Sequence, residues 1–341
     1  MGSGLVLRGL IASAALLLAL PASAQSLIAH RGASGERPEH TLAAFELAIR
    51  QGADFIELDL VPTKDGELVV RHENELSLST DVASRAEFAG RKTTKVIDGR
   101  SFTGWFSEDF TLAEIQTLRA RERIPAIRPR NRAFDGLYSV PTVQEVIALA
   151  RAIEALPGGR RVGFYIELKH PAWFLSKGHD TTAILARALA AAGLDGPGSA
   201  VVIQTFDVEP LERLARGDRF TRVQLIAAQG GPADRNGQTY ASMLTPDGLR
   251  AVAAYADGVA LDLALFDGDP ERARAIVNAA RGAGLAVHVW TLRRENRYLW
   301  PAFRDGTDPD SPGDLAGAWR LLSGLGIQGI ITDNPGDVPR P

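Results

Sequence analysis

The sequence contains no cysteine among its 341 residues. This absence excludes disulfide bonds, thiolate zinc sites, cysteine nucleophiles and a lipid-modified N-terminal cysteine. Any metal would have to be held by carboxylates, histidines, carbonyls or water. That ligand set favours hard cations such as calcium or magnesium.

The sequence also has little net charge, because 38 basic residues nearly balance 41 acidic ones and leave a formal charge of −3. A protein whose main partner is nucleic acid or an anionic membrane surface carries a much stronger positive charge. We therefore expect neither partner.

A long apolar run occurs only at the N-terminus, where Arg8 precedes a run from Leu10 to Leu20 and the small residues 22–24 follow. This order is typical of a cleavable secretory signal peptide. The alternative, a membrane anchor, would need a longer run to span a bilayer. We expect cleavage after Ala24, export to the periplasm or medium, and no stable membrane insertion.

Downstream of residue 25, apolar runs with strand character alternate with helical, alanine-rich stretches. The predicted main strands are 27–30, 54–61, 162–168, 200–205, 222–227, 258–263, 286–291 and 329–332. Eight strands alternating with helices predict an α/β fold, a (β/α)8 TIM barrel formed by one domain over residues 25–341. An open doubly wound sheet is the alternative, but the glycine-rich phosphate fingerprint is missing after the first strand.

The chain between the second and third main strands is too long for a single crossover. A hairpin turn at Lys64-Asp65-Gly66 predicts an extra strand over 68–72. Residues of about 74–160 then read as a small insertion, with helices expected at 111–119 and 142–155. An arginine cluster at 119–132 is either a solvated connecting loop or a positive rim that attracts an anionic substrate.

Carboxylates occur inside two predicted strands. Glu57 and Asp59 share one face of the second strand, and Glu167 lies near the end of the third. Buried carboxylates are costly unless they are paired or bound to metal, and three of them at one point repel each other. We therefore expect a divalent cation with oxygen ligands at the carboxyl ends of the strands.

Basic side chains accompany the carboxylates. Arg31 follows the first strand, and Lys169 ends the third. A phosphate that bridges the metal and these two cations is the substrate group that fits best. His30 and His72 lie at the ends of the first strand and of the hairpin, where they could act as general acid and base.

These residues carry a family resemblance. The stretch HRGASGERPEHT and the following GADFIELDLVPTKDGELVVRH resemble the glycerophosphodiester phosphodiesterase family. The periplasmic branch is the most similar, because His40 stands where an asparagine is common elsewhere. The similarity continues through IELK at 166–169, VHVWTLR at 287–293 and ITDNPG at 331–336.

The resemblance implies a TIM barrel with a small insertion after the second-strand hairpin. It also implies metal ligands at Glu57, Asp59 and Glu167, usually for calcium in this branch or magnesium in relatives. The acid–base pair would be His30 and His72, and the phosphate contacts would be Arg31 and Lys169.

Two positions depart from the family pattern. Glu73 stands where an aspartate usually follows the second histidine, and Leu78 stands where an arginine is favoured. Neither departure removes a proposed catalytic group. Both concern the support of His72 and the packing of the insertion.

Aromatic residues late in the chain are candidates for substrate contact. Trp290 ends a predicted strand, and the family places an aromatic wall there for the glycerol carbons. Tyr298, Trp300 and Phe303 surround a loop at 305–314 and are equally compatible with packing. Phe206 and Gln204 are weaker candidates.

The sequence thus predicts an exported, metal-dependent hydrolase that converts glycerophosphodiesters into glycerol 3-phosphate and an alcohol. The alternatives are a lysophospholipase D or sphingomyelinase D-like enzyme acting on lipids, and a phosphate-ester binding protein that has lost catalysis. The small-molecule phosphodiester is the only partner that the sequence indicates.

Overall fold

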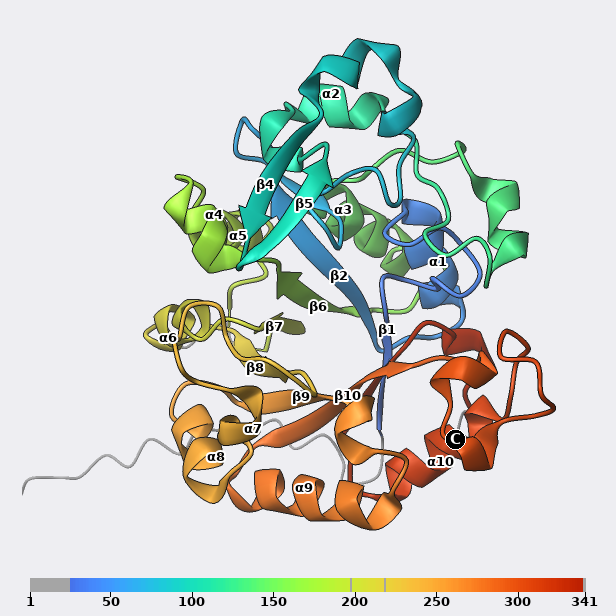
Figure 1. Cartoon of the computed structure of the whole chain (residues 1–341), viewed down its shortest axis with the longest axis vertical. Helices are drawn as coiled ribbons and strands as arrows, with labels where there is room; N and C mark the ends of the chain where they lie inside the picture. Colours follow the sequence, from blue (N-terminus) through green and yellow to red (C-terminus); the bar gives the residue numbers. More distant parts are fainter. Residues whose placement is uncertain (1–24, 197, 218, 340–341) are drawn as a thin grey trace, which may run out of the picture.

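The fold is a barrel of parallel strands surrounded by helices, with an added layer over one end (Figure 1). The computed structural model describes residues 25–339 except 197 and 218. The predicted signal peptide, 1–24, therefore lies outside the described residues. Within them, no helix is long and apolar enough to cross a membrane.

Eight parallel strands form the barrel, as the sequence predicts. They are β1 (Ser26–Ala29), β2 (Phe55–Pro62), β6 (Gly163–Leu168), β7 (Val201–Thr205), β8 (Thr221–Ile226), β9 (Gly258–Asp262), β10 (Ala286–Leu292) and β11 (Gly329–Thr332). Neighbours along the chain are neighbours in the sheet, and β1 pairs with both β11 and β2. That double pairing closes the barrel and rules out the open-sheet alternative.

Side-chain alternation in the strands divides the apolar residues into two cores. In β2, Ile56, Leu58 and Leu60 belong to the large core between the strands and the outer helices. A smaller core inside the barrel includes Ile28 and Tyr165. Because alternate β2 residues face inward, Glu57 and Asp59 point into the barrel above this inner core.

The outer helices follow the strands in sequence. They include α1 (Leu42–Arg50), α5 (Thr181–Ala191), α6 (Glu209–Ala215), α8 (Pro246–Ala253), α9 (Pro270–Gly282) and α10 (Leu315–Gly324), with short helices α4 (Pro171–Ser176) and α7 (Tyr240–Met243). Side-chain caps fix where several begin; Thr41, for example, accepts a hydrogen bond from the Ala44 N–H at the start of α1.

The hairpin after β2 returns as β3 (Leu68–Val70), which pairs antiparallel with the last residues of β2. The turn contains Gly66 at φ +84°, a conformation that glycine adopts without strain. The prediction extended this strand to His72, but β3 ends at Val70. His72 therefore lies in the segment just beyond the strand, at the carboxyl end of the barrel.

Between β3 and β6 the chain forms the layer that contains α2, β4 and β5 at the top of Figure 1. The two helices expected here are α2 (Leu112–Thr117) and α3 (Val143–Glu154), each with the capping box that its sequence predicts. The hairpin β4 (Thr93–Ile97) and β5 (Arg100–Gly104) was not expected, because four of the five residues of β5 are exposed and leave no hydrophobic pattern.

This layer has a core of its own, in which Phe88, Trp105 and Phe110 pack with Ile115. It is attached to the end of β2, because Ser107 Oγ donates to the Pro62 carbonyl at 2.9 Å. The layer therefore rests on the end of the barrel where the catalytic candidates lie.

Candidate active site

The polar residues singled out in the sequence meet at the carboxyl ends of β1, β2 and β6. Asp59 lies directly opposite Glu167 in the parallel pairing of β2 with β6, so register alone places their side chains next to each other. Glu57 lies one inward position earlier in β2. The structure thus brings together carboxylates that are more than a hundred residues apart in the chain.

Ligand atoms of Glu57, Asp59 and Glu167 all lie within 4.8 Å of one another, and all three side chains are buried. Burial, with the neighbouring carboxylates adding to it, raises the pKa of Glu57 well above its ordinary value and that of Glu167 to about 8. Asp59 Oδ1 is buried without a hydrogen-bond partner among the described residues. Three crowded oxygen donors with one unsatisfied lone-pair site fit a hard divalent cation.

Arg31 is fixed in the middle of the site by its backbone and by its side chain. Its N–H donates to Glu57 Oε2 at 2.9 Å, and its Nη1 donates to Glu39 Oε2 at 2.9 Å. Nε lies 3.4 Å from Asp59 Oδ2 and makes no hydrogen bond to a described residue. That N–H is a donor available to a bound anion.

Lys169 contacts the acidic triad, the name used from here on for Glu57, Asp59 and Glu167. Its Nζ donates to Glu167 Oε1 at 2.6 Å and lies 3.9 Å from Asp59 Oδ1. Burial lowers the pKa of Lys169, but Glu167 and Asp59 outweigh this effect and raise it overall. The ammonium group therefore stays charged beside the carboxylates.

His30 forms a pair with Asp333, which follows β11. The distance from His30 Nδ1 to Asp333 Oδ1 is 2.5 Å. Burial, together with the nearby Arg31, lowers the pKa of His30 to about 4, although Asp333 opposes this. The carboxylate on Nδ1 orients the ring and leaves Nε2 for the site.

His72 has the same arrangement with Glu73, whose Oε1 lies 2.6 Å from His72 Nδ1. On the other side of the ring, Lys169 Nζ lies 3.2 Å from Nε2. Burial, Arg31 and Lys169 lower the pKa of His72 to about 3. Glu73 departs from the family pattern in length but still places a carboxylate on the ring.

Sequence reasoning singled out neither Glu39 nor Asp333, and it mentioned His40 only as a mark of the branch. His40 Nε2 lies 2.8 Å from Asp59 Oδ2 and fixes that carboxylate from behind. Each of the three lies in a quoted motif, ERPEHT or ITDNPG. The three residues were therefore visible in the sequence, but only their contacts in the structure show which side chain of the site each one holds.

The aromatic candidates separate into two groups. Trp290 packs edge-on against Phe206 with ring centroids 5.8 Å apart, and Lys169 Nζ lies 5.8 Å above the Phe206 ring. Both rings therefore stand near the polar site. Trp300 instead packs edge-on against Phe266 and, like Tyr298 and Phe303, lines a small apolar pocket beside α10. Gln204 Nε2 donates to Glu57 Oε1 at 3.2 Å and so supports the triad.

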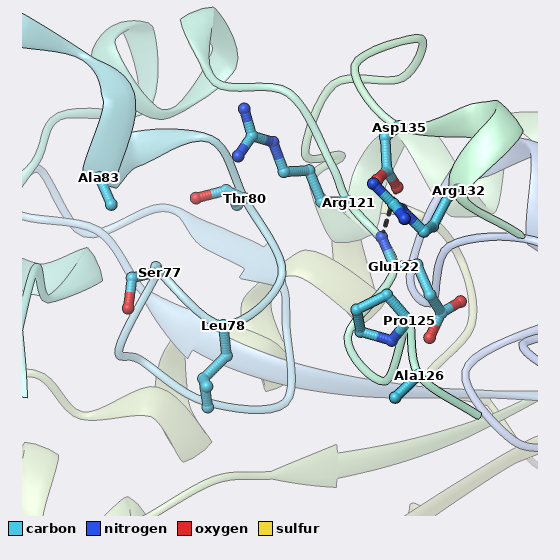
Figure 2. A pocket seen from close by; sticks show the side chains of 10 residues that line it. All are labelled: Ser77, Leu78, Thr80, Ala83, Arg121, Glu122, Pro125, Ala126, Arg132 and Asp135. Atoms are coloured by element: carbon cyan, nitrogen blue, oxygen red, sulfur yellow. Dashed lines mark hydrogen bonds between the residues drawn. The ribbon is translucent and has the colours of Figure 1, made fainter. Parts of the chain in front are cut away.

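A cavity of about 410 Å³ lies in the added layer. Its walls come from the chain around Leu78 and from the arginine-rich segment (Figure 2). Arg121 and Arg132 line this cavity together with Glu122 and Asp135. Leu78, the second departure from the family pattern, is half exposed here and belongs to the cavity wall.

The sequence model of the glycerophosphoryl diester phosphodiesterase family matches residues 30–337. A glycerophosphodiester phosphodiesterase of Haemophilus influenzae is 32% identical over 337 residues, which cover 91% of this chain and 87% of that protein. One of Arabidopsis thaliana is 31% identical over 327 residues, covering 91% and 84%.

Solved structures agree on the fold. A putative glycerophosphoryl diester phosphodiesterase of Silicibacter pomeroyi superimposes with a TM-score of 0.64 at 24% identity, covering 92% of each chain. A phosphodiesterase of Oleispira antarctica, solved with the product sn-glycerol-3-phosphate, gives a TM-score of 0.59 at 20% identity, covering 91% and 94%. With its barrel and the match over nearly its whole described length, the chain belongs to the glycerophosphoryl diester phosphodiesterase family.

Proposed function

We propose that this protein hydrolyses glycerophosphodiesters, such as glycerophosphocholine or glycerophosphoethanolamine, to sn-glycerol 3-phosphate and an alcohol. One observation carries the proposal. Two histidines, each with a carboxylate on Nδ1, lie beside a buried acidic triad, and so do the positively charged side chains of Arg31 and Lys169. Acid–base groups, a metal site and phosphate contacts are the parts that phosphodiester hydrolysis needs.

The two histidines share the proton transfers. With its Nδ1 proton held by a carboxylate, a neutral imidazole can accept a proton on Nε2 from the attacking hydroxyl. The other histidine donates an Nε2 proton to the oxygen of the leaving alcohol. It would first have to take up that proton as the phosphate binds, because burial lowers the pKa of both histidines. The attacking hydroxyl belongs either to water or to the substrate glycerol, in which case a cyclic phosphate forms first.

Arg31 and Lys169 would bind the non-bridging phosphate oxygens. The Nε–H of Arg31 makes no hydrogen bond to a described residue, and the ammonium group of Lys169 lies beside Glu167 and Asp59, so both cations border the triad. Their positive charge becomes more favourable as negative charge develops on the phosphate oxygens in the transition state. Trp290 and Phe206 would cover the glycerol carbons with an apolar surface.

Glu57, Asp59 and Glu167 would hold the metal, which we propose to be calcium, with magnesium as the alternative. When bound, a divalent cation there neutralises phosphate charge and polarises the phosphoryl group. The three buried carboxylates, two of them with a raised pKa, support this assignment, because a cation would relieve their mutual repulsion.

We also propose that the protein is exported and belongs to the periplasmic branch of the family. The N-terminal signal-like segment, the absence of cysteine and His40 support this. Fractionation of cells, with N-terminal sequencing of the exported protein, tests the proposal. A mature chain that begins at Gln25 is expected, and retention of the full-length chain in the cytosol would contradict it.

The decisive experiment follows glycerol 3-phosphate release from glycerophosphocholine after chelation and after readdition of calcium or magnesium. We expect activity to disappear on chelation and return with the metal. Long-chain lysophospholipids and sphingomyelin, tested in parallel, should be poor substrates. If they outcompete glycerophosphocholine, the lipid-active alternative is correct, and tight binding without turnover would indicate a binding protein.

A further inference from the structure

One segment of the added layer reaches both catalytic histidine pairs. Residues 121–131 follow α2 in the chain and form most of the arginine cluster at 119–132 noted in the sequence. Arg121 and Arg130 are exposed, whereas Arg128 is buried and Arg123 is partly buried. The two inward arginines contact carboxylates of the active site, one for each histidine.

Arg123 contacts the His72 side. Its Nη2 donates to Glu73 Oε1, the same oxygen that lies 2.6 Å from His72 Nδ1. Its Nη1 lies 3.5 Å from Glu39, which in turn holds Arg31. Burial raises the pKa of Glu73, but His72 and Arg123 outweigh it and lower the pKa to about 2.

Arg128 contacts the His30 side. Its Nη2 donates to Asp333 Oδ2 at 2.6 Å, while Asp333 Oδ1 faces His30 Nδ1. Its Nε donates to Glu295 at 2.7 Å and its Nη1 to the Ser34 carbonyl at 3.1 Å. Arg293 Nε also donates to Asp333 Oδ2, at 2.8 Å, but the Arg293 side chain is 26% exposed, whereas that of Arg128 is 7% exposed.

The conformation of the segment is itself fixed. Glu122 Oε1 accepts from the Ile124 N–H at 2.8 Å, and its Oε2 accepts from Asn131 Nδ2 at 2.7 Å. Asn131 Nδ2 also donates to the Ser34 carbonyl at 3.2 Å, beside the first strand. These bonds hold Arg123 and Arg128 at a set spacing across the mouth of the barrel.

The contacts of Arg123 and Arg128 fit neither of the two interpretations of the arginine cluster. Arg123 and Arg128 are already paired with carboxylates, so they are not an open rim for an anionic substrate. Their exposed neighbours Arg121 and Arg132 face the separate cavity of Figure 2. A solvated loop would not bury a guanidinium among three acceptors, because burying a charge is costly unless it is fully paired.

We propose that Arg123 and Arg128 are positioning residues, which act through Glu73 and Asp333 to keep both catalytic histidines in their working orientation. Segment 121–131 thereby connects the His72–Glu73 pair with the His30–Asp333 pair. The inference rests on the proposed function of this site and adds to it the part played by the insertion.

The positioning role predicts a kinetic effect that a role in fold stability alone would not produce. Arg123 binds the oxygen of Glu73 that meets His72 Nδ1, whereas Arg128 binds the other oxygen of Asp333 from the one that meets His30 Nδ1. Both help to hold the carboxylate ionised and in a fixed orientation, so the removal of either should lower kcat and leave substrate affinity nearly unchanged. The loss should also depend on the matching carboxylate, because an arginine that acts through Glu73 has no effect once that charge is gone.

The experiment is a set of double-mutant cycles on the mature exported protein, with glycerophosphocholine as substrate. Arg123→Gln and Arg128→Gln should each lower kcat about tenfold, the lower end of the range for residues that orient a ligating or catalytic group, with KM changed less than about twofold. The matched doubles R123Q/E73Q and R128Q/D333N should be no slower than E73Q and D333N alone. The crossed doubles R123Q/D333N and R128Q/E73Q should multiply the losses.

Arg130→Gln is the control, since it removes an exposed charge from the same segment and should leave kcat unchanged. Thermal unfolding monitors the fold of every variant. If R128Q does not fold, Arg128→Lys keeps the charge without the fork and should lower kcat in the wild-type background but not in D333N.

Unchanged kcat in both single arginine variants would overturn the inference. It would also be overturned if the losses of kcat multiplied in the matched double variants as they do in the crossed ones. A wild-type protein that cleaves no phosphodiester would overturn the proposed function instead. The two failures are therefore distinguishable.

Discussion

The Nζ atom of Lys169 lies 3.2 Å from Nε2 of His72. Because Nδ1 of the same ring faces Glu73, the lysine occupies the nitrogen that a substrate would need. A phosphate that draws Lys169 towards itself would therefore free His72 Nε2. Substrate binding and exposure of the histidine are linked at this contact.

Replacing Lys169 by methionine should have two effects. Loss of the phosphate contact should raise KM, by about tenfold if one charged hydrogen bond of about 1.5 kcal/mol is lost. Loss of the cation should also raise the pKa of His72, because burial, Arg31 and Lys169 lower it while Glu73 and Asp59 raise it. The limb of the pH–rate profile that reports His72 should move to higher pH, and an unmoved profile would contradict this.

A second prediction assigns the roles of the two histidines. His30→Ala and His72→Ala should each lower kcat for glycerophosphocholine by about 10² to 10⁴. A substrate whose leaving group is p-nitrophenol needs no general acid, since the phenolate leaves without a proton. The variant that lacks the acid should therefore recover most of its activity on this ester, whereas the variant that lacks the base should not.

Equal recovery of both variants, or of neither, would contradict a division into one acid and one base. His179→Ala is the control, because this histidine follows α4 and packs against Phe174 of that helix, and it makes no contact with the triad among those given above. Full activity of His30→Ala or His72→Ala on glycerophosphocholine would show that the acid–base assignment is wrong.

The sequence predicts those features of the fold and the site that depend on residues close together in the chain. The barrel follows from strand and helix periodicity, and Glu57, Asp59 and Glu167 follow from alternation along single strands. Strand ends are harder: β3 stops at Val70 because pairing with β2 stops there, which the residue pattern does not reveal.

Asp333 and Arg123, which support the two histidines, escape sequence reasoning for a different reason. Asp333 is 303 residues from His30, and Arg123 is 50 residues from Glu73. Each lies in a loop with no periodic pattern, so only the closure of the barrel and the docking of the insertion bring them together. The arginine cluster is evident in the sequence, but the sequence does not show that Arg123 and Arg128 contact carboxylates of the active site.

A third prediction concerns the metal. Burial raises the pKa of Glu167 to about 8, with Lys169 opposing this effect and Asp59 adding to it, so its folded-state pKa exceeds the unfolded one. Without metal, the free energy of unfolding should then fall as pH rises from about 4.5 to 8, the interval between the two values. Calcium needs the ionised carboxylate, so its affinity should increase with pH up to about 8 and binding should release a proton.

Calorimetry in buffers of different ionisation enthalpy measures that proton release, and thermal unfolding measures the stabilisation by calcium. Glu167→Gln should reduce the proton release, leaving the part that comes from Glu57, and should abolish most of the stabilisation. Glu154→Gln, an exposed acid at the end of α3, is the control and should change neither. Calcium binding that is independent of pH in the wild type would contradict the prediction.

The last prediction concerns His288, in the barrel beneath the triad. Its Nδ1 lies 2.7 Å from the Tyr165 hydroxyl, and burial lowers its pKa to about 4. Since the unfolded chain binds this proton near pH 6.5, stability should be full above that pH and decline as pH falls towards 4, by at most about 1.4 kcal/mol per pH unit. His288→Gln should reduce this decline in urea unfolding measured between pH 6.5 and 4 without abolishing it, because burial also lowers the pKa of His30 and His72. Tyr165→Phe removes the hydrogen bond but keeps the buried histidine, so it should retain the wild-type slope; an equally reduced slope in both variants would show that the hydrogen bond, not the proton, sets this part of the acid sensitivity.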